Sequence, residues 1–385
     1  MNKKIIVTGA TGQVGSYMCE YLLNETSHEV IGAVRRTSQL IYSNLSDCLG
    51  RKKFKTIDLD LVDTHSINNA IINEKPDYFI NLGAATFVAD SWNTPVNHFQ
   101  VNACGVLHIL EAIRTHQPNC RFYSSGTSEM WGDVKYSPQD EKHPFSPRSP
   151  YGASKCAAHY LTKVYRESYN LYAIQGIMLN NESERRQEYF VTRKITKKVA
   201  EIKNKIDRGQ LFKPLEFDPL QVGNLNSLRD WSHSLDFVDG IWRMLNEDFY
   251  MEDINYHIYD AWLDGNYGEK ERKFLCSKIK EYVLSSGKSH SIREFIEKCF
   301  NYVGIKGEWM GEGLDEIYNL IEINGNRVDY KKDLVVVNPK FFRPAEVNTL
   351  CGDSSLIKKE LDWQPQISFD ELINRMMAND LKQYA

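Results

Sequence analysis

The chain has 385 residues, of which 42% are hydrophobic, and its 47 basic and 51 acidic residues give a formal charge of −4. This length and composition predict a soluble globular protein of about two domains. The near-neutral charge gives no electrostatic reason to expect a nucleic acid or an anionic membrane surface as a partner.

The N-terminal segment and the cysteines indicate the cellular compartment of the protein. The apolar run that starts at Ile5 stops after three residues, at Thr8-Gly9, whereas a secretory signal needs about 7 to 15 apolar residues. No apolar run approaches the ~20 residues of a membrane span. The eight cysteines are scattered, without Cys-x-x-Cys pairs or zinc spacing. We therefore expect a cytoplasmic protein with reduced thiols and no metal site.

The first expected elements are a strand over Lys4–Thr8, a glycine-rich turn and a helix over Ser16–Leu23. Strand, glycine turn and helix form the context in which a glycine fingerprint binds a dinucleotide. Gly9 would allow the tight turn, Gly12 the approach of N–H groups to a pyrophosphate, and Gly15 close helix packing. The spacing is Gly-x-x-Gly-x-x-Gly rather than Gly-x-Gly-x-x-Gly, and a glycine turn without function is the alternative.

The second expected strand, His28–Val34, ends at Arg35-Arg36-Thr37-Ser38. An NAD-selective protein usually places an acidic residue here for the ribose diol, whereas two arginines and two hydroxyls suit a 2′-phosphate. This pattern favours NADP over NAD. The alternative is that both arginines are solvated surface charges.

The following segments alternate between strand and helix patterns. Further strands are expected at Thr56–Leu61, Tyr78–Leu82, Arg121–Ser125 and Tyr172–Leu179, with a helix over Asn102–Thr115. This alternation predicts an α/β fold, a Rossmann-type doubly wound parallel sheet with ligands at the carboxyl ends of its strands.

Two domains are expected. Residues 1–180 would form the NADP-binding domain, to which residues 225–260 return, and residues 181–385 would form a smaller C-terminal α/β substrate domain. Ile202–Leu220 and Asp248–Tyr282 look inserted. Both are rich in charged residues and tyrosine without a sustained apolar period, which predicts loops or short surface helices.

Tyr151 and Lys155 are four residues apart, and Cys156–Tyr169 reads as helix, so the two side chains should share one helical face. An adjacent ammonium would lower the tyrosine pKa from ~10 towards operating pH. Such a phenol can act as a general base on an alcohol. Chance spacing is the alternative, but Thr127 and Glu129 follow a strand end on the same side as the glycine turn, so we expect all of these groups to converge.

These motifs together resemble those of the extended short-chain dehydrogenases/reductases and, among them, the GDP-mannose 4,6-dehydratase family. The similarity runs nearly end to end apart from the two insertions. Tyr-x-x-x-Lys and the glycine turn mark only the superfamily. More specific are Thr-Ser-Glu at 127–129, Thr-Arg-Lys-Ile at 192–195, Gly-Asn-Leu at 223–225 and Arg-Asp-Trp at 229–231.

The resemblance implies a dehydratase in which NADP is borrowed and returned within one turnover. Tyr151 would take the proton of the sugar C4 hydroxyl, with Lys155 lowering its pKa and holding the nicotinamide ribose, and Thr127 would bond the developing C4 ketone. Glu129 would remove the C5 proton and then help the C6 hydroxide leave as water. The product would be a GDP-4-keto-6-deoxy-sugar.

The resemblance also implies binding residues and an assembly. The expected cofactor residues are Gly9, Gly12, Gln13, Val14, Gly15, Arg35, Asp60, Leu61, Leu82, Gly83, Ala84, Thr86, Tyr151 and Lys155. The expected GDP-sugar residues are Ser128, Asn180, Arg185, Lys194, Val222, Arg229, Arg343 and Glu346. A homodimer or homotetramer is expected.

One run departs from the family pattern. The family usually shows Asn-His-Glu-Ser-Pro-Arg-Arg-Gly, and this chain has Asn-Asn-Glu-Ser-Glu-Arg-Arg-Gln at 180–187. The sequence therefore does not determine the contact on the nicotinamide side or the shape of this loop. A related substrate, such as a GDP-heptose, also remains an alternative. Two other hypotheses remain: a nucleotide-sugar reductase or epimerase that performs no elimination, and a binding or regulatory protein without turnover.

Overall fold

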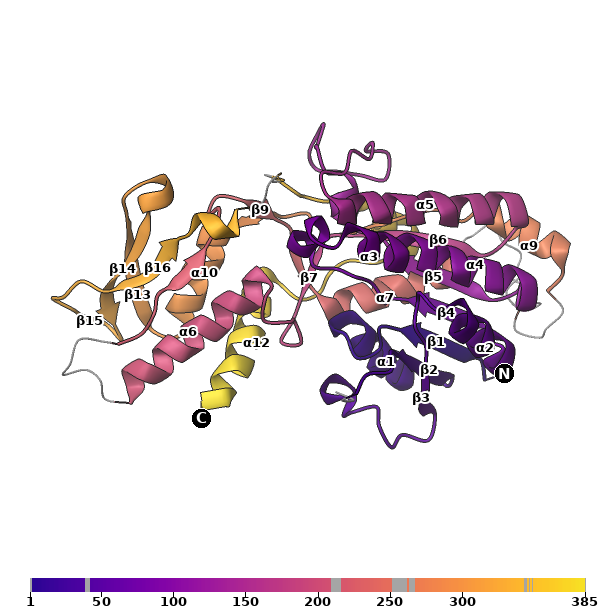
Figure 1. Ribbon diagram of the computed structural model, residues 1–385, viewed down its shortest axis with the longest axis horizontal. Coiled ribbons are helices and arrows are strands. Elements are labelled where there is room, and N and C mark those ends of the chain that lie inside the picture. The colour runs from indigo at the N-terminus through magenta and orange to yellow at the C-terminus, as the bar shows by residue number, and fades with distance from the viewer. Residues whose placement is uncertain are drawn as a thin grey trace.

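The computed structural model describes residues 2–38, 42–208, 216–250, 262, 267–342, 345, 347 and 349–384. Two units lie side by side along the long axis of the molecule (Figure 1). The larger unit is built on a seven-stranded sheet, and the smaller unit contains a mixed sheet with three helices of its own.

The large sheet confirms the expected Rossmann-type architecture. Its strand order is β11-β6-β5-β4-β1-β2-β3, and each pair of neighbours is parallel. The strands are β1 (Lys4–Thr8), β2 (Glu29–Val34), β3 (Phe54–Asp58), β4 (Tyr78–Asn81), β5 (Arg121–Ser125), β6 (Ala173–Met178) and β11 (Val283–Leu284). The third strand begins and ends earlier than predicted, and β11 was not predicted.

Helices cover both faces of this sheet. On one face α2 (Thr64–Glu74), α4 (Gly105–His116) and α5 (Pro150–Tyr169) pack against one another, and on the other α1 (Gln13–Glu25) packs against α7 (Ser234–Leu245). A short helix, α3 (Pro95–Phe99), and a π-helical turn (Gln100–Cys104) precede α4.

Helix α5 begins six residues before the predicted Cys156. Ser149 is its N-cap, and its Oγ accepts a hydrogen bond of 3.0 Å from the Gly152 N–H. Pro150 occupies the first helical position, where a proline costs no hydrogen bond. The cap therefore places Tyr151 in the first turn of the helix, next to the carboxyl ends of the strands.

The smaller unit has the sheet β13 (Ile305–Met310), β14 (Ile317–Ile323), β16 (Asp333–Val337) and β8 (Leu220–Val222), with β15 (Asn326–Arg327) paired to β14. Its helices are α6 (Val191–Asp207), α10 (Ile292–Tyr302) and α12 (Phe369–Leu381). Two short ladders lie at the junction, β7 (Asn180–Glu182) with β10 (Trp231–His233) and β9 (Leu228–Arg229) with β12 (His290–Ser291).

The first expected insertion is partly a continuation of α6. Ile195, Val199, Ile202 and Ile206 recur at helical spacing and are all buried in the core of the smaller unit. The prediction that the chain becomes a loop or surface helix at Ile202 was therefore wrong, because lysines between these positions obscure the apolar period. Residues 209–215 lie outside the described part of the chain.

The second expected insertion is tied into the larger unit. Asp248 accepts two hydrogen bonds from the Arg121 guanidinium, at 2.7 and 2.8 Å, and both side chains are buried. Trp262 lies against the same guanidinium, 4.1 Å from the ring centre, and is buried. The described parts of this segment also include α9 (Glu269–Cys276) and the fully buried Tyr282. The expectation of a surface segment is corrected, because these contacts close the amino end of the sheet.

Each of the eight cysteines is described, and each carries a free thiol. Among the residues whose structure is described, no helix combines the length and apolar character required to cross a membrane. The same residues contain no group of three or more His, Cys, Asp or Glu side chains placed to hold a metal ion.

Candidate active site

The glycine turn between β1 and α1 is a close-packed backbone cradle. Gly9 has φ of +65°, and a Cβ there would lie 2.8 Å from the Gly83 nitrogen. A Cβ on Gly15 would lie 2.1 Å from the Gly9 carbonyl oxygen, so only glycine fits at either position. Gly12 is the N-cap of α1, and its N–H donates to the Gly9 carbonyl at 2.8 Å. The N-terminus of α1 thus opens at the carboxyl edge of the sheet, as a pyrophosphate site requires.

Neighbouring strand ends meet at this turn. The Thr8 hydroxyl donates to Asn81 Oδ1 at 2.6 Å and accepts from the Gly83 N–H at 3.0 Å, which joins the ends of β1 and β4. Leu61 lies against Gly83 from the loop after β3. The edge therefore gathers the segments that were expected to hold a dinucleotide.

The remaining expected cofactor residues differ in environment. Arg35 and Thr86 are exposed, and Leu82 and Ala84 are partly buried. The Asp60 carboxylate accepts from the Val62 N–H at 3.1 Å and so stabilises its own turn.

The first two residues of α1 contact different parts of the chain. The Gln13 amide donates to the backbone and side-chain oxygens of Asn181, at 2.9 and 3.1 Å, and accepts from the Ser183 hydroxyl at 2.7 Å. Val14 packs against the core of the larger unit. Gln13 thus connects the glycine turn to the run that departs from the family pattern.

Tyr151 is buried in the first turn of α5, with 7% of its surface exposed. The pKa of Tyr151 is raised to about 12: burial is the largest cause, the Glu129 charge acts in the same direction, and a hydrogen bond with Thr127 and the Arg186 charge oppose it. Lys155 is not among these causes, and its ammonium contacts another group, so its expected effect on this pKa stays a prediction.

That group is Ser125, at the end of β5. The Lys155 ammonium donates to the Ser125 carbonyl at 2.8 Å and lies 3.3 Å from its hydroxyl. Burial lowers the pKa of Lys155 to about 8. The lysine is therefore held at the carboxyl edge by the strand end itself.

Glu129 lies in the 3-10 turn that follows β5, and only 8% of its surface is exposed. Thr127 caps this turn, since its hydroxyl accepts from the Glu129 N–H at 3.3 Å. A Cβ on Gly152 would lie 2.6 Å from the Glu129 carbonyl oxygen, so the turn packs directly on the start of α5. The structure thus brings the partly buried Thr127 together with the buried Glu129 and Tyr151, and Glu129 does not point into bulk solvent.

Several expected substrate residues surround this cluster. Ser128 is buried beside Glu129. Asn180, in β7, has a buried Oδ1 without a hydrogen-bond partner. An unpaired buried amide oxygen is costly, so its presence in β7 is typical of a site that a polar ligand completes.

The other expected substrate residues lie in the smaller unit and the junction. The Lys194 ammonium, on α6, lies 3.3 Å from the centre of the Phe341 ring, and burial, with a smaller contribution from Lys340, lowers its pKa to about 8. Val222 is buried at the end of β8, and the buried Arg229 donates to the Leu228 carbonyl at 2.9 Å. Arg343 and Glu346 lie outside the described residues.

Arg185 is not placed as expected. Its guanidinium donates to both carboxylate oxygens of Glu20, at 2.8 and 3.0 Å, and lies 4.0 Å from the centre of the Tyr17 ring. Both partners are on α1. Because a carboxylate already satisfies this fork, the geometry favours a structural role for Arg185 over phosphate binding.

The neighbouring Arg186 was missed by sequence reasoning. Its guanidinium lies 3.4 Å from the centre of the Phe190 ring, its Nε is 3.1 Å from Glu182 Oε2, and its charge lowers the pKa of Tyr151. Two adjacent arginines carry no sequence signal that separates them. Only the turn that contains them decides which one faces the site.

Asn102 was also missed. It lies in the π-helical turn before α4, where its amide donates to the Ala85 carbonyl at 3.0 Å and to the Ser154 hydroxyl at 3.1 Å. Such turns often occur at functional sites. Here the turn joins the loop after β4 to α5, the helix that carries Tyr151 and Lys155.

Comparison with known proteins agrees with this geometry. The family model described as GDP-mannose 4,6 dehydratase matches residues 6–264 and 266–376. The GDP-mannose 4,6-dehydratase of Vibrio cholerae is 38% identical over 100% of this chain and 95% of that protein. The human GDP-mannose 4,6 dehydratase is 35% identical over 98% of this chain and 91% of its own length.

Solved structures share the fold at lower identity. A UDP-glucose 4-epimerase from Thermotoga maritima has a TM-score of 0.71 at 18% identity and covers 99% of this chain and 100% of its own. A dTDP-glucose 4,6-dehydratase from Bacillus anthracis, solved in complex with NAD, has a TM-score of 0.70 at 16% identity and covers 99% of this chain and 97% of its own. Taken with the full-length sequence matches, the buried cluster and the glycine turn lead to one conclusion: the chain belongs to the GDP-mannose 4,6-dehydratase family.

Proposed function

We propose that this chain converts GDP-mannose into a GDP-4-keto-6-deoxy-sugar by removing water across C5 and C6, with NADP as a cofactor that is neither consumed nor produced. The observation that carries the proposal is the buried cluster of Thr127, Glu129 and Tyr151 at the carboxyl edge of the sheet, beside the glycine turn. A carboxylate and a phenol that face the same space can serve two different positions of one sugar ring.

The residues present fit a dinucleotide. The glycine turn forms a cradle that a Cβ would fill, and the N-terminus of α1 opens beside it. Gly9, Gly12 and Gly15 would hold the pyrophosphate, and the exposed Arg35 would favour a 2′-phosphate and hence NADP. When bound, this cofactor supplies a hydride acceptor for C4 and returns the hydride to C6.

Tyr151 acts as the base for the C4 hydroxyl. Its buried phenol must lose a proton to do so, and the charge of Arg186 and the hydrogen bond with Thr127 both favour that loss. Thr127 then donates a hydrogen bond from its hydroxyl to the oxygen that becomes the C4 ketone, and it keeps its proton. Lys155, fixed by Ser125, supplies a further positive charge at the same edge.

Glu129 carries out the elimination. The C4 ketone acidifies the C5 proton, which the Glu129 carboxylate removes, and the resulting carboxylic acid gives that proton to the departing C6 hydroxyl, which leaves as water. Tyr151 returns the proton taken from the C4 hydroxyl to C5 when C6 receives its hydride. Both side chains finish in their starting protonation state, and the net change is the loss of one water molecule.

The GDP moiety would extend from this cluster towards the smaller unit. Lys194 and Lys340 are neighbouring cations beside Phe341, an arrangement suited to a diphosphate. Asn180, whose Oδ1 is unpaired, begins β7, which lies in the chain between β6 and α6, the helix that carries Lys194.

Mass analysis of the product tests the proposal. Incubation with GDP-mannose and catalytic NADP should give a product lighter by two hydrogens and one oxygen, without accumulation of NADPH. A product of unchanged mass would identify an epimerase, and stoichiometric NADPH would identify a simple oxidoreductase. A parallel panel of GDP-linked hexoses and heptoses determines whether mannose is the preferred sugar.

A further inference from the structure

The loop between β7 and α6 begins with a tight turn at Ser183–Arg186. The Arg186 N–H donates to the Ser183 carbonyl at 3.0 Å, which closes a four-residue β-turn, and the Ser183 hydroxyl accepts from the Arg185 N–H at 3.1 Å. Glu184 therefore occupies the second position of the turn. Proline is favoured there because its ring presets φ near −65°. A glutamate has no such restraint and must be held in another way.

The Glu184 carboxylate is held by a buried histidine. His233 is fully buried at the N-cap of α7, and its Nδ1 accepts from the Leu235 N–H at 3.1 Å. The ring proton is therefore on Nε2, which donates to Glu184 Oε2 at 3.1 Å. Burial raises the pKa of Glu184, but the interactions of its carboxylate with His233, with its own backbone N–H and with the Tyr17 hydroxyl together lower that pKa to about 2. The imidazole thus donates to an ionised carboxylate.

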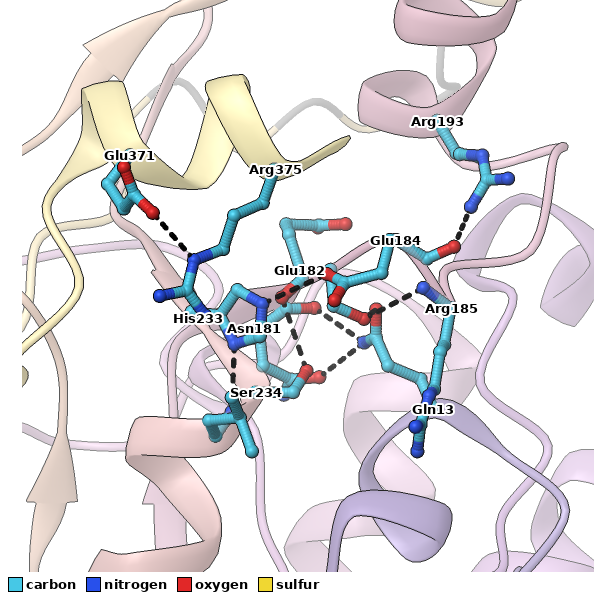
Figure 2. A network of polar contacts seen from close by, with 12 residues as sticks. Gln13, Asn181, Glu182, Glu184, Arg185, Arg193, His233, Ser234, Glu371 and Arg375 are labelled. Atoms are coloured by element: carbon cyan, nitrogen blue, oxygen red, sulfur yellow. Dashed lines mark hydrogen bonds and ion pairs between the residues drawn. The ribbon is translucent and has the colours of Figure 1, made fainter. Parts of the chain in front are cut away.

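Glu184 is also held through its backbone carbonyl and through the adjacent residue, Arg185. Arg193, on α6, donates to the Glu184 carbonyl and forms an ion pair of 2.6 Å with Asp380 on α12. Arg185 is bound to Glu20 on α1. Figure 2 shows Glu184 between His233 and the two arginines. The turn is therefore fixed to the larger unit and to the smaller unit at once.

The turn ends at the residue that acts on the catalytic phenol. Arg186 lies directly after the anchored pair, packs over Phe190 and carries the charge that lowers the pKa of Tyr151. If the turn loosens at Glu184, its second position, the Arg186 guanidinium should move as well. Arg186 is the fourth residue of the turn, and its own N–H donates the hydrogen bond that closes it.

We propose that Glu184 and His233 are positioning residues, and that their hydrogen bond fixes the turn that directs the Arg186 guanidinium towards Tyr151. The pair replaces with side-chain contacts the restraint that proline would supply through its ring. The inference deepens the proposed function, since it concerns the environment of the same base.

A set of variants tests this pair. Glu184→Ala removes the carboxylate, and His233→Asn removes the reach to Glu184 but keeps a side chain that can cap α7. Each should lower kcat by about ten- to a hundredfold, the range expected for a misplaced catalytic group. The rising limb of the pH profile should also move to higher pH, because Tyr151 loses the influence of Arg186.

Glu184→Pro is the rescue variant. Proline restores the restraint at the second turn position, and the Glu184 N–H that it removes faces only its own carboxylate. We expect near-normal kcat and a normal pH profile, and no further loss when His233→Asn is added to it. Glu188→Ala is the matched control, since this glutamate lies on the same loop and pairs with Lys197 in an exposed position.

Amide hydrogen exchange separates failure of this inference from failure of the proposed function. Residues 183–190 should exchange faster in Glu184→Ala and His233→Asn and at the native rate in Glu184→Pro and Glu188→Ala, whatever the substrate is. Native exchange in Glu184→Ala, or a Glu184→Pro variant that still depends on His233, would overturn the inference. An inactive native protein with the predicted exchange pattern would overturn only the assigned substrate.

Discussion

The two edges of the seven-stranded sheet are both lined with buried polar groups, but they use them differently. At the amino edge, the Arg121 guanidinium is bound by the Asp248 carboxylate and the Leu245 carbonyl and is packed against Trp262. At the carboxyl edge, burial shifts the pKa values of Tyr151 and Lys155 away from their usual ranges. The first edge pairs its charges with each other, and the second holds titratable groups that face a ligand site.

This difference indicates how one sheet serves stability and catalysis at once. Ligands of open parallel sheets bind at the carboxyl ends of the strands, so the opposite edge is free to be closed by other parts of the chain. Here a segment from beyond α7 closes it, through Asp248, Trp262 and Tyr282. Changes at the amino edge should therefore alter stability without altering turnover. Changes at the carboxyl edge should alter turnover without altering stability.

The largest effect is expected for Tyr151→Phe. Loss of a general base lowers turnover by about 10²- to 10⁴-fold, whereas loss of one buried hydroxyl changes the free energy of unfolding by no more than about 1 kcal/mol. Steady-state kinetics and denaturant unfolding of the same sample measure both quantities. Tyr165→Phe is the control on the same helix, because its hydroxyl binds Glu111 instead. Native turnover in Tyr151→Phe would rule out the assigned base.

The opposite result is expected for Asp248→Asn. This change leaves the buried Arg121 guanidinium without its counter-charge, which costs about 3 to 5 kcal/mol of stability. Turnover per folded molecule should stay native. The exposed pair of Asp133 with Lys135 is the comparison, and Asp133→Asn should leave the free energy of unfolding nearly unchanged. A lower kcat in folded Asp248→Asn would show that the two edges are not independent.

The pH dependence of turnover should reflect Lys155. Its pKa in the folded protein is lowered to about 8, so its ammonium charge is present below that pH and lost above it. Because Tyr151, with a pKa of about 12, must also lose its proton, we expect kcat to rise with pH up to about 8 and to level off above it, where the gain of phenolate is offset by the loss of ammonium. The folded-state stability should rise from about pH 8 up to the usual lysine pKa, because the unfolded chain binds more protons there. An activity that keeps rising with the same slope well above pH 8 would contradict a role for this charge.

The smallest effect is expected for Glu247→Gln, at the amino edge. The Tyr282 hydroxyl lies 3.0 Å from Glu247 and 2.9 Å from Glu360, and its single proton cannot serve two carboxylates. Burial raises the pKa of Glu247 to about 8. Stability should therefore be full at low pH and fall as pH rises through 8. The glutamine variant should lose this dependence, with melting temperatures a few degrees above native at alkaline pH, and its kcat should not change.

Much of the carboxyl edge could be predicted from the sequence, because its signals are local. The β-branched runs of β1 and β5, the glycine spacing and the four-residue step from Tyr151 to Lys155 each lie within one short segment. The amino edge could not be predicted, because its contacts join residues that are far apart in the sequence. Strand β11 has two residues and pairs with β6 more than a hundred positions away, and Asp248 meets Arg121 across a similar separation.

Two features of the site itself also escaped prediction, for physical reasons. The pKa of Tyr151 depends on how much water reaches the phenol, and a Tyr-x-x-x-Lys spacing contains no information about burial. The difference between Arg185 and Arg186 depends on the turn at Ser183–Arg186, which places one guanidinium against Glu20 on α1 and the other beside Glu182 and Phe190.

The most direct test of the central claim, that one buried cluster oxidises C4 and eliminates water with separate side chains, is a product analysis of Glu129→Gln. The amide keeps the size of the side chain but cannot remove the C5 proton, whereas Tyr151 is unchanged. With GDP-mannose and NADP, this variant should form reduced nicotinamide, at most one equivalent per active site, and no product that has lost water. Formation of the dehydrated product at the native rate would contradict the account.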